Sequence, residues 1–303
     1  VVLPRFHNHV VIEQRCDIML VEVKDVKKAA VLVDSAADIT DEQAKDLGVY
    51  VIRMNLNIDG TDYIEYDDIS GTELLNRMKA GAIVKTSQPP LGRMIECWES
   101  LLEEYERILY IPISSKLSGT YQTAVITAQD YDNKVVVADA LSACAPIQYL
   151  AKCAVEMIDK GYELEEIKQR IEDSYMFAAI MPSNLVYLKR GGRISPAAAA
   201  LGNLLKIVPV LSVNHGEIDV LDKVRTIRKA YTVGMTYAAN VPDKDNYEWM
   251  LVYADIDKAT VDLYVEEFEK MVQHPVKAMP VLSIITSHTG PCLGVGRIKK
   301  IRY

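Results

Sequence analysis

The chain has 303 residues, half of them hydrophobic, and its formal net charge of −8 argues against a nucleic-acid-binding protein, which needs a strongly basic face. Its five cysteines are widely spaced and form no C-x-x-C pair, which favours reduced thiols and predicts neither disulfides nor a metal site. No apolar run reaches the ~20 residues of a membrane span and no secretory cleavage site is visible, so we expect a soluble, cytoplasmic protein.

The part of the chain from residue 30 to 177 alternates short apolar strands with helices. Two helices are expected to begin after Thr40 and Ser70, because Gln43 and Glu73 complete the pattern of a capping box three residues later. Strands are predicted at 31–33, 49–56, 107–113 and 135–138. Nearly continuous apolar strands separated by helices favour βαβ units and a mostly parallel sheet.

A second α/β unit is predicted from residue 178 to 303. It contains a hairpin around Asn214-His215-Gly216 and a helix that begins at Thr226. Residues 1–29 precede the first clear strand signal, and we assign this N-terminal extension no role. The strands predicted in this unit are 208–213, 217–220, 249–254 and 281–285, and an apolar stretch at 176–180 lies at the boundary.

Polar segments rich in hydroxyl groups follow several of the predicted strands. Their hydroxyls and amides can donate hydrogen bonds to a carboxylate or a phosphate, and a helix N-terminus adds a favourable dipole. Serine and threonine are also common helix caps, which is the simpler explanation for any single loop. Gly119 favours a ligand, because glycine lets a ligand approach the backbone closely. The candidates are Thr86, Ser87, Ser114, Ser115, Ser118, Gly119, Thr120, Ser142 and Ser287 to Gly290.

A basic, glycine-rich stretch lies at Arg190-Gly191-Gly192-Arg193. Two glycines between arginines predict a tight turn that presents guanidinium groups to a carboxylate, a phosphate or an acidic partner protein. An ordinary solvated turn explains the same pattern. His288 is expected in a polar loop at the end of a strand, where it either bonds a ligand or has a structural role.

Signatures of catalysis are scarce. The sequence contains no H-E-x-x-H, Walker or G-x-G-x-x-G motif, and Ser118 does not lie in a G-x-S-x-G elbow. An acyl-ester hydrolase with Ser118 as nucleophile and His288 as base is one alternative, and it requires these side chains within hydrogen-bond reach. A regulator that docks onto other proteins is another.

Several segments together resemble the DegV family, which includes the fatty-acid-binding subunits of bacterial fatty acid kinase. They occur in the family's order over residues 31–296. The most specific are Ser118-Gly119-Thr120, Arg190-Gly191-Gly192-Arg193 and His288-Thr289-Gly290-Pro291. The others are Val33-Asp34-Ser35 with Ala37-Asp38, Thr86-Ser87-Gln88-Pro89, Ser114-Ser115 with Leu117, Tyr121-Gln122 and Asp139.

This resemblance implies an α/β fold of two domains with a long-chain fatty acid between them. The N-terminal domain would hold a mostly parallel sheet flanked by helices, and the C-terminal domain a mixed sheet. The carboxylate of the acid would lie on Thr86 and Ser118, with His288 near the head group. The residues expected around this site are Ser87, Gly119, Thr120 and Ser142.

The resemblance also implies a non-catalytic role without a cofactor. A separate kinase would phosphorylate the bound palmitate, stearate or oleate, and Arg190 to Arg193 would form part of the surface that faces this kinase. Exchange of the acid at a membrane surface is compatible with such a carrier. A carboxylate held by neutral hydroxyls, without an arginine clamp, would remain available as a nucleophile.

One segment departs from the family's pattern. After Asp139 the family usually continues through small residues and glycines, whereas this chain has Cys144 and Pro146. Proline fixes φ and suits the first turn of a helix. The departure leaves the preferred length and unsaturation of the acid open.

Overall fold

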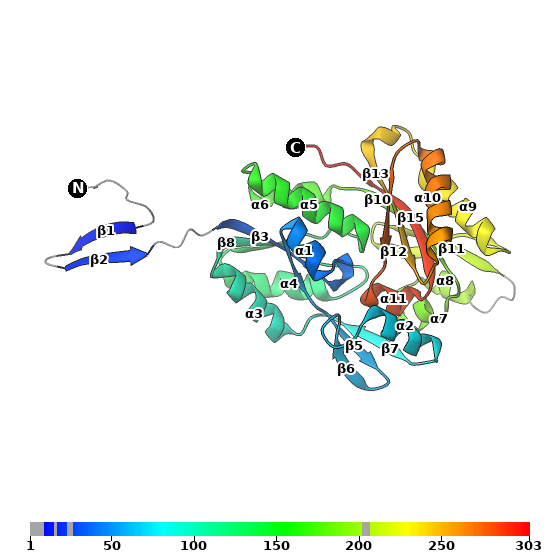
Figure 1. Ribbon diagram of the computed structural model, residues 1–303, viewed down its shortest axis with the longest axis horizontal. Coiled ribbons are helices and arrows are strands. Elements are labelled where there is room, and N and C mark those ends of the chain that lie inside the picture. The colour runs from blue at the N-terminus through cyan, green and yellow to red at the C-terminus, as the bar shows by residue number, and fades with distance from the viewer. Residues whose placement is uncertain (1–8, 15–16, 23–26, 202–206) are drawn as a thin grey trace.

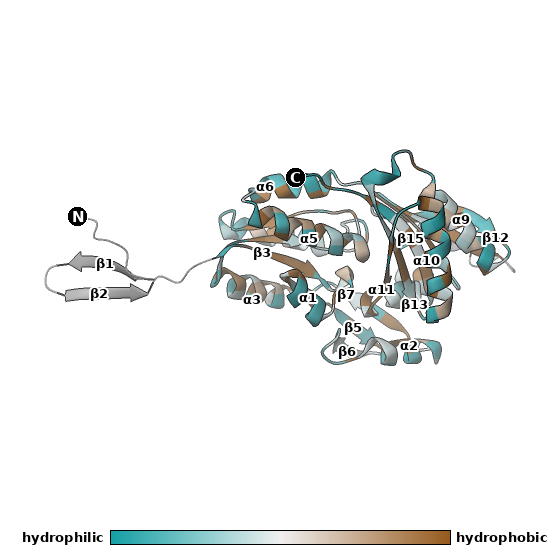
Figure 2. Ribbon diagram, turned by 45° about the horizontal axis from the view of Figure 1, so that its top comes forward, coloured by the Kyte–Doolittle hydropathy of each residue, from teal (hydrophilic) through white to brown (hydrophobic). Residues whose placement is uncertain are grey.

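The computed structural model describes residues 9–14, 17–22, 27–201 and 207–303. Two large β-sheets lie side by side in it, each with its own helices (Figure 1). Hydrophilic residues are prominent on the surface helices, while strand β3 (Lys27–Asp34) is strongly hydrophobic (Figure 2). The predicted α/β class is therefore confirmed.

Four parallel strands form the N-terminal sheet, in the order β4-β3-β8-β9. Helices α1, α5 and α6 pack on one face, and α3 and α4 pack on the other. The strands are β3 (Lys27–Asp34), β4 (Val49–Ile52), β8 (Tyr105–Ile111) and β9 (Val135–Val137). The helices are η1 (Ser35–Ala37), α1 (Asp41–Leu47), α3 (Leu91–Leu102), α4 (Thr120–Ala128), η2 (Gln129–Tyr131), α5 (Ala145–Asp159) and α6 (Leu164–Glu172).

The two predicted helix starts are confirmed by their capping bonds. The Thr40 hydroxyl accepts a bond from the Gln43 amide at 3.2 Å, and the Gln43 side chain accepts one from the Thr40 amide at 3.0 Å. At the next helix the Ser70 hydroxyl accepts a bond from the Glu73 amide at 3.2 Å. Each cap satisfies amides that have no partner inside the helix.

A small antiparallel sheet, in the order β6-β5-β7, extends from the N-terminal half. The prediction of one strand over 49–56 is wrong, because the chain leaves the parallel sheet after Ile52 and joins the small sheet at Asn55. Buried Arg53 lies at this break and donates to the Ile39 carbonyl at 3.0 Å. The elements are β5 (Asn55–Ile58), β6 (Thr61–Ile64), α2 (Gly71–Lys79) and β7 (Val84–Ser87).

The C-terminal sheet is mixed, as expected, with the order β12-β11-β10-β15-β13-β14 and parallel pairing only between β13 and β14. Helices α9 and α10 cover its outer face. The strands are β10 (Met176–Pro182), β11 (Val208–Asn214), β12 (Glu217–Val224), β13 (Tyr247–Ala254), β14 (Val276–Pro280) and β15 (Cys292–Lys299). The helices are α7 (Val186–Gly191), α8 (Pro196–Leu201), α9 (Ile227–Ala239), η3 (Lys244–Asn246) and α10 (Lys258–Val272).

Residues 281–285 do not form the predicted strand. Most of them belong to helix α11 (Ser283–Thr289), and the strand of this region, β14, ends before them at Pro280. His288 therefore lies in the last turn of a helix rather than in a loop. Strand β15 follows in a stretch for which we predict no strand.

Buried carboxyl groups hold the start of α11. The Asp38 carboxylate accepts a hydrogen bond from the Leu282 amide at 3.0 Å, and Glu65 lies beside the Ser283 backbone. Asp34, Asp38 and Glu65 are all almost fully inaccessible to solvent. A carboxyl oxygen that accepts a backbone amide at a helix start does the work of a capping side chain, and here Asp38 replaces the local capping signal that the sequence lacks.

The extension before residue 27 contains an antiparallel pair, β1 (His9–Gln14) with β2 (Asp17–Glu22), which lies apart from the two large sheets in Figure 1. The first strand of the parallel sheet begins at Lys27, slightly before the predicted limit of the extension. The boundary predicted between residues 177 and 178 lies inside β10, and the division into domains stays a prediction. Among the helices of the described ranges, none has both the length and the apolar character needed to cross a membrane.

The buried carboxyl groups predict an unusual dependence of stability on pH. Burial raises the pKa of Asp38 to about 8 and that of Asp34 to about 7. Since these folded-state values exceed the unfolded ones, the favourable contribution is complete at low pH and is lost as the pH rises through them. Each group that keeps its proton only in the folded state lowers the free energy of unfolding by about 1.4 kcal/mol per pH unit.

In Asp38→Asn, the free energy of unfolding should fall less steeply with pH, by about 1.4 kcal/mol per pH unit, because asparagine does not titrate. Asparagine keeps the acceptor for the Leu282 amide and tolerates the positive φ of 54° at this position. Urea unfolding of both proteins from pH 5 to pH 9 measures the two slopes. Equal slopes in the wild type and the variant would show that Asp38 is ionised in the folded protein.

Candidate functional site

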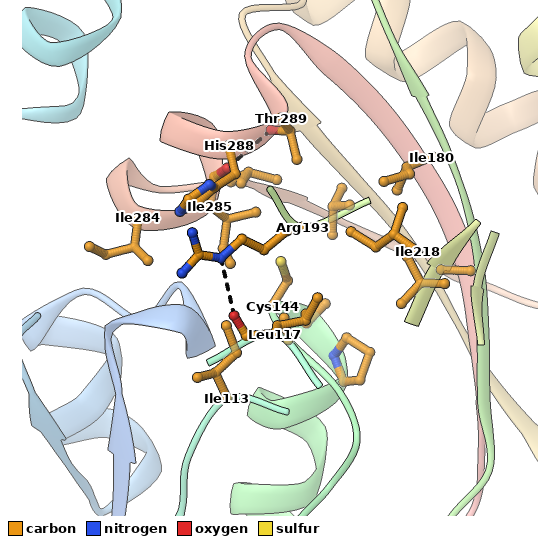
Figure 3. Close-up of a pocket in the computed structure, with 18 of the residues that line it drawn as sticks. Ile113, Leu117, Cys144, Ile180, Arg193, Ile218, Ile284, Ile285, His288 and Thr289 are labelled. Carbon is orange, nitrogen blue, oxygen red and sulfur yellow. Dashed lines mark hydrogen bonds between the residues drawn. The ribbon is translucent and has the colours of Figure 1, made fainter. Parts of the chain in front are cut away.

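A largely apolar cavity of about 240 Å³ lies between the two large sheets. One wall comes from the N-terminal half, including Ile113, Leu117 and residues 143–146. The other wall comes from the face of the C-terminal sheet that α9 and α10 do not cover, and α11 contributes Ile284 and Ile285. Figure 3 shows these side chains converging on one space. Such a site can bury a long hydrocarbon chain.

Strand β15 brings two glycines to the cavity wall. Gly294 pairs with Ile180 and Val252 on its neighbours, and an ideal Cβ on it would lie 2.8 Å from a methyl group of Val252. A Cβ on Gly296 would lie 2.8 Å from the Phe177 carbonyl oxygen. The flanking strands therefore occupy the space that a side chain would need, and glycine at alternate positions of a strand is the sequence signal for this close packing.

Thr86 and His288 meet at the polar end of the cavity. The Thr86 Oγ1 and His288 Nε2 atoms are 2.7 Å apart, although Thr86 lies in edge strand β7 and not in the loop that we predict. Burial, with a smaller effect of the Arg193 charge, lowers the pKa of His288 to about 4. The imidazole is therefore neutral at physiological pH.

The second polar group lies at the start of α4. The Ser118 hydroxyl is 2.9 Å from the Thr120 hydroxyl and accepts the Thr120 amide at 3.3 Å. Gly119 is the N-cap residue of α4, so the positive end of the helix dipole lies beside Ser118. Gln88, which we single out only as part of a motif, also lines the cavity and accepts a bond from the Thr123 hydroxyl at 3.1 Å.

Arg193 lines the cavity, whereas the sequence suggests a surface role for it. Its side chain extends between α11 and the Leu117 segment, and its Nε donates to the Leu117 carbonyl at 3.3 Å (Figure 3). A second guanidinium nitrogen donates to the Gly191 carbonyl. The polar end of the cavity therefore includes one cation beside the neutral hydroxyls.

The rest of the basic stretch ends a helix. Arg190 is exposed and, with Gly191, forms the last turn of α7, while Gly192 closes the helix with a φ of 68°. The predicted tight turn is thus the C-terminal cap of a helix. Gly191 packs against the ring of His288, with an ideal Cβ only 2.2 Å from Nδ1.

The remaining candidates divide into those at the cavity and those outside it. Ser87 and Gly119 line the cavity. Thr120 is buried, does not line the cavity and supports Ser118 through its hydroxyl. Ser142 is also buried away from the lining, where its carbonyl accepts the Ser114 amide at 2.9 Å and its hydroxyl faces the Ala143 carbonyl at 3.4 Å.

The geometry does not assemble the Ser118 and His288 pair that a hydrolase needs. Ser118 bonds to Thr120, and His288 bonds to Thr86. The Nδ1 atom of His288 is buried without a hydrogen-bond partner, so no third group orients the imidazole as a base. Across the described ranges, no group of three or more His, Cys, Asp or Glu side chains is arranged to hold a metal ion.

Cys144 marks the departure from the family's pattern. Its backbone has φ 57° and ψ −141°, a conformation that side chains other than glycine adopt only under strain. Cys144 lines the cavity beside the Asp38 carboxyl group, and burial raises the pKa of its thiol well above its usual value. Pro146 lies in the first turn of α5, as we predict, and also lines the cavity.

Comparisons with known proteins agree with this architecture. The family model described as "Uncharacterised protein, DegV family" matches residues 28–300. A DegV domain-containing protein of Staphylococcus aureus is 33% identical over 203 residues, which are 66% of this chain and 72% of that protein.

Two solved structures share the fold over most of their length. A DegV family protein from Thermus thermophilus, described by its fatty acid binding, has a TM-score of 0.79 at 27% identity and covers 90% of this chain and 99% of its own. DegV from Bacillus subtilis, described as a fatty acid binding protein, has a TM-score of 0.78 at 26% identity and covers 90% and 100%. Since the family model spans nearly the whole described chain, the chain belongs to the DegV family.

Proposed function

We propose that this protein binds a long-chain fatty acid, with the hydrocarbon in the cavity and the carboxylate at its polar end. The single observation that carries the proposal is a largely apolar cavity whose lining includes the Thr86 and Ser118 hydroxyls and the His288 imidazole, with Thr86 bonded to His288. The fatty acid binding described for the Thermus and Bacillus relatives supports it.

The hydrocarbon would provide most of the affinity. An acid of C16 to C18 has roughly 15 methylene groups, and each contributes ~0.8 kcal/mol when it leaves water, before the cost of association. Palmitate, stearate and oleate are therefore the ligands that we test.

The carboxylate would receive hydrogen bonds from the Thr86 and Ser118 hydroxyls beside the positive end of α4. The sequence suggests a carboxylate site without an arginine clamp, whereas Arg193 lines the same cavity. A single guanidinium already bonded to two carbonyl groups is a weaker clamp than a bidentate arginine pair, so the carboxylate keeps its reactivity.

Mass spectrometry of an organic extract from the purified, untreated protein tests this proposal. A fatty acid of C14 to C18 at close to one molecule per chain is the expected result. An empty extract, together with no saturable uptake of added palmitate or oleate, would contradict it.

Thr86→Ala and Ser118→Ala should each weaken palmitate binding by about tenfold or more, since a hydrogen bond to a charged group contributes about 1.5–3 kcal/mol. Ser115→Ala is the matched control, because Ser115 is exposed on the same loop and does not line the cavity. Competition with radiolabelled palmitate measures the affinities. Retention of wild-type affinity in Ser118→Ala would exclude the proposed head-group site.

We further propose that the bound acid is presented to a separate kinase, with Arg190 on the docking surface. Arg190 is exposed and lies outside the cavity lining. It directly precedes Gly191, which contacts His288 of the head-group site. Basic side chains on a net-acidic protein favour association with an acidic patch of a partner.

Arg190→Glu should lower ATP-dependent acyl phosphate formation by a fatty acid kinase at least about tenfold, since charge reversal replaces an attraction by a repulsion. Palmitate affinity should stay within about twofold of the wild type. Unchanged phosphorylation at limiting concentrations of the carrier would remove Arg190 from the docking surface.

A further inference from the structure

Gly191 has ordinary helical backbone, so conformational freedom is not the reason for a glycine there. It is the last residue of α7, and among the glycines of this segment only Gly192 has a positive φ. In a helix, alanine is favoured over glycine by about 0.8–1 kcal/mol. An alanine Cβ at this position would lie 2.2 Å from Nδ1 and 3.0 Å from Cε1 of His288. The imidazole therefore excludes any side chain from position 191.

The contact bears on the proton of the neutral ring. A neutral imidazole carries one proton, either on Nε2, which faces Thr86, or on Nδ1, which faces Gly191. Nδ1 is buried without a partner, and the Gly191 carbonyl already accepts a bond from Arg193. A proton on Nδ1 would be a buried donor without an acceptor, which proteins avoid more strictly than a bare acceptor.

The position of this proton decides which way the Thr86 hydroxyl points. With the proton on Nε2, the ring donates to Thr86 Oγ1 at 2.7 Å, and the hydroxyl hydrogen is free to point into the cavity. With the proton on Nδ1, the same hydroxyl must donate to the ring and has no hydrogen left for a ligand. Only the first arrangement lets Thr86 donate to a carboxylate.

We propose that Gly191 is a positioning residue for the head-group site, which seats the His288 ring with Nδ1 unprotonated and so fixes the Thr86 hydroxyl as a donor to the fatty acid. This inference rests on the proposed function for the identity of the ligand. It assigns the first glycine of the basic stretch to carboxylate binding rather than to partner docking.

A double-mutant cycle tests the inference. Gly191→Ala should weaken palmitate binding by about tenfold in the wild type, because the new methyl group displaces the ring and with it the Thr86 bond. In a His288→Ala background the same substitution should change the affinity by less than about twofold. An equal loss in both backgrounds would show that Gly191 acts on the fold and not through His288.

Gly92→Ala is the matched control for placing alanine in a helix. Gly92 lies in α3, has no positive φ, and an ideal Cβ on it has no heavy atom within 4 Å. Its palmitate affinity and melting temperature should not fall. A comparable loss in Gly92→Ala would mean that the effect of Gly191→Ala does not depend on the imidazole.

Nitrogen NMR of protein labelled with ¹⁵N-histidine reads the tautomer in the wild-type protein itself. The chain has five histidines, and His288→Gln identifies the resonances of interest. We expect an unprotonated Nδ1 and a protonated Nε2, with no change on titration from pH 8 to pH 5.5. A protonated Nδ1 in the palmitate complex would overturn the inference.

The two proposals fail in different ways. If the wild-type protein binds no fatty acid, the proposed function fails. The contact between Gly191 and His288 can then still be tested by the NMR tautomer and by the same double-mutant cycle with melting temperatures in place of affinities. If palmitate binds but the cycle shows no coupling, only the positioning role fails.

Discussion

Helix α11 belongs to the C-terminal half but contacts the N-terminal half at both of its ends, and the polar end of the cavity depends on these contacts. Its first amides meet Asp38 and Glu65 from the N-terminal half, while its last turn carries His288 to Thr86 on β7. The Arg193 guanidinium lies close to its final turn, where the helix dipole favours a positive charge. A shift of this short helix would therefore move the His288 imidazole away from its hydroxyl partner.

The buried groups around the cavity are kept close to neutral. Burial raises the pKa of the carboxyl groups of Asp34, Asp38 and Glu65, and it lowers the pKa of His288, so each shift favours the uncharged form. Removing charges from water is costly, and neutral groups with hydrogen bonds reduce that cost. Under the proposed function, a carboxylate in this site would meet neutral donors and the Arg193 guanidinium, which already donates to the Leu117 carbonyl.

Local sequence signals predict the regular parts of the fold well. The capping boxes at Thr40 and Ser70 and the alternating strands and helices are local patterns, and the structure follows them. The apolar, β-branched run around Ile284 and Ile285 is typical of a strand, yet it forms a helix whose N-cap amide, that of Leu282, donates to the Asp38 carboxyl group more than 200 positions away in the chain. No pattern within the run itself carries that information.

The contacts within the candidate site are also invisible to local sequence patterns. Family resemblance suggested Thr86, Ser118 and His288, but the bond between Thr86 and His288 joins positions 202 residues apart, and no local pattern indicates it. The Arg-Gly-Gly-Arg stretch looks like an exposed turn because its spacing does not reveal that it ends a helix against the imidazole.

The segment from Arg190 to Arg193, at the end of α7 and just beyond it, has three different surroundings. Arg190 is exposed, Gly191 touches the His288 ring, and Arg193 reaches into the cavity to the Leu117 carbonyl. Because these residues are consecutive, a displacement of Arg190 would carry its neighbours with it. Any protein that docks on Arg190 and displaces this segment must therefore change the affinity of the cavity for its ligand. By thermodynamic reciprocity, an occupied cavity must change the affinity for that protein by the same factor. A carrier with this arrangement would distinguish its loaded form from its empty form at the docking surface, without a second ligand site.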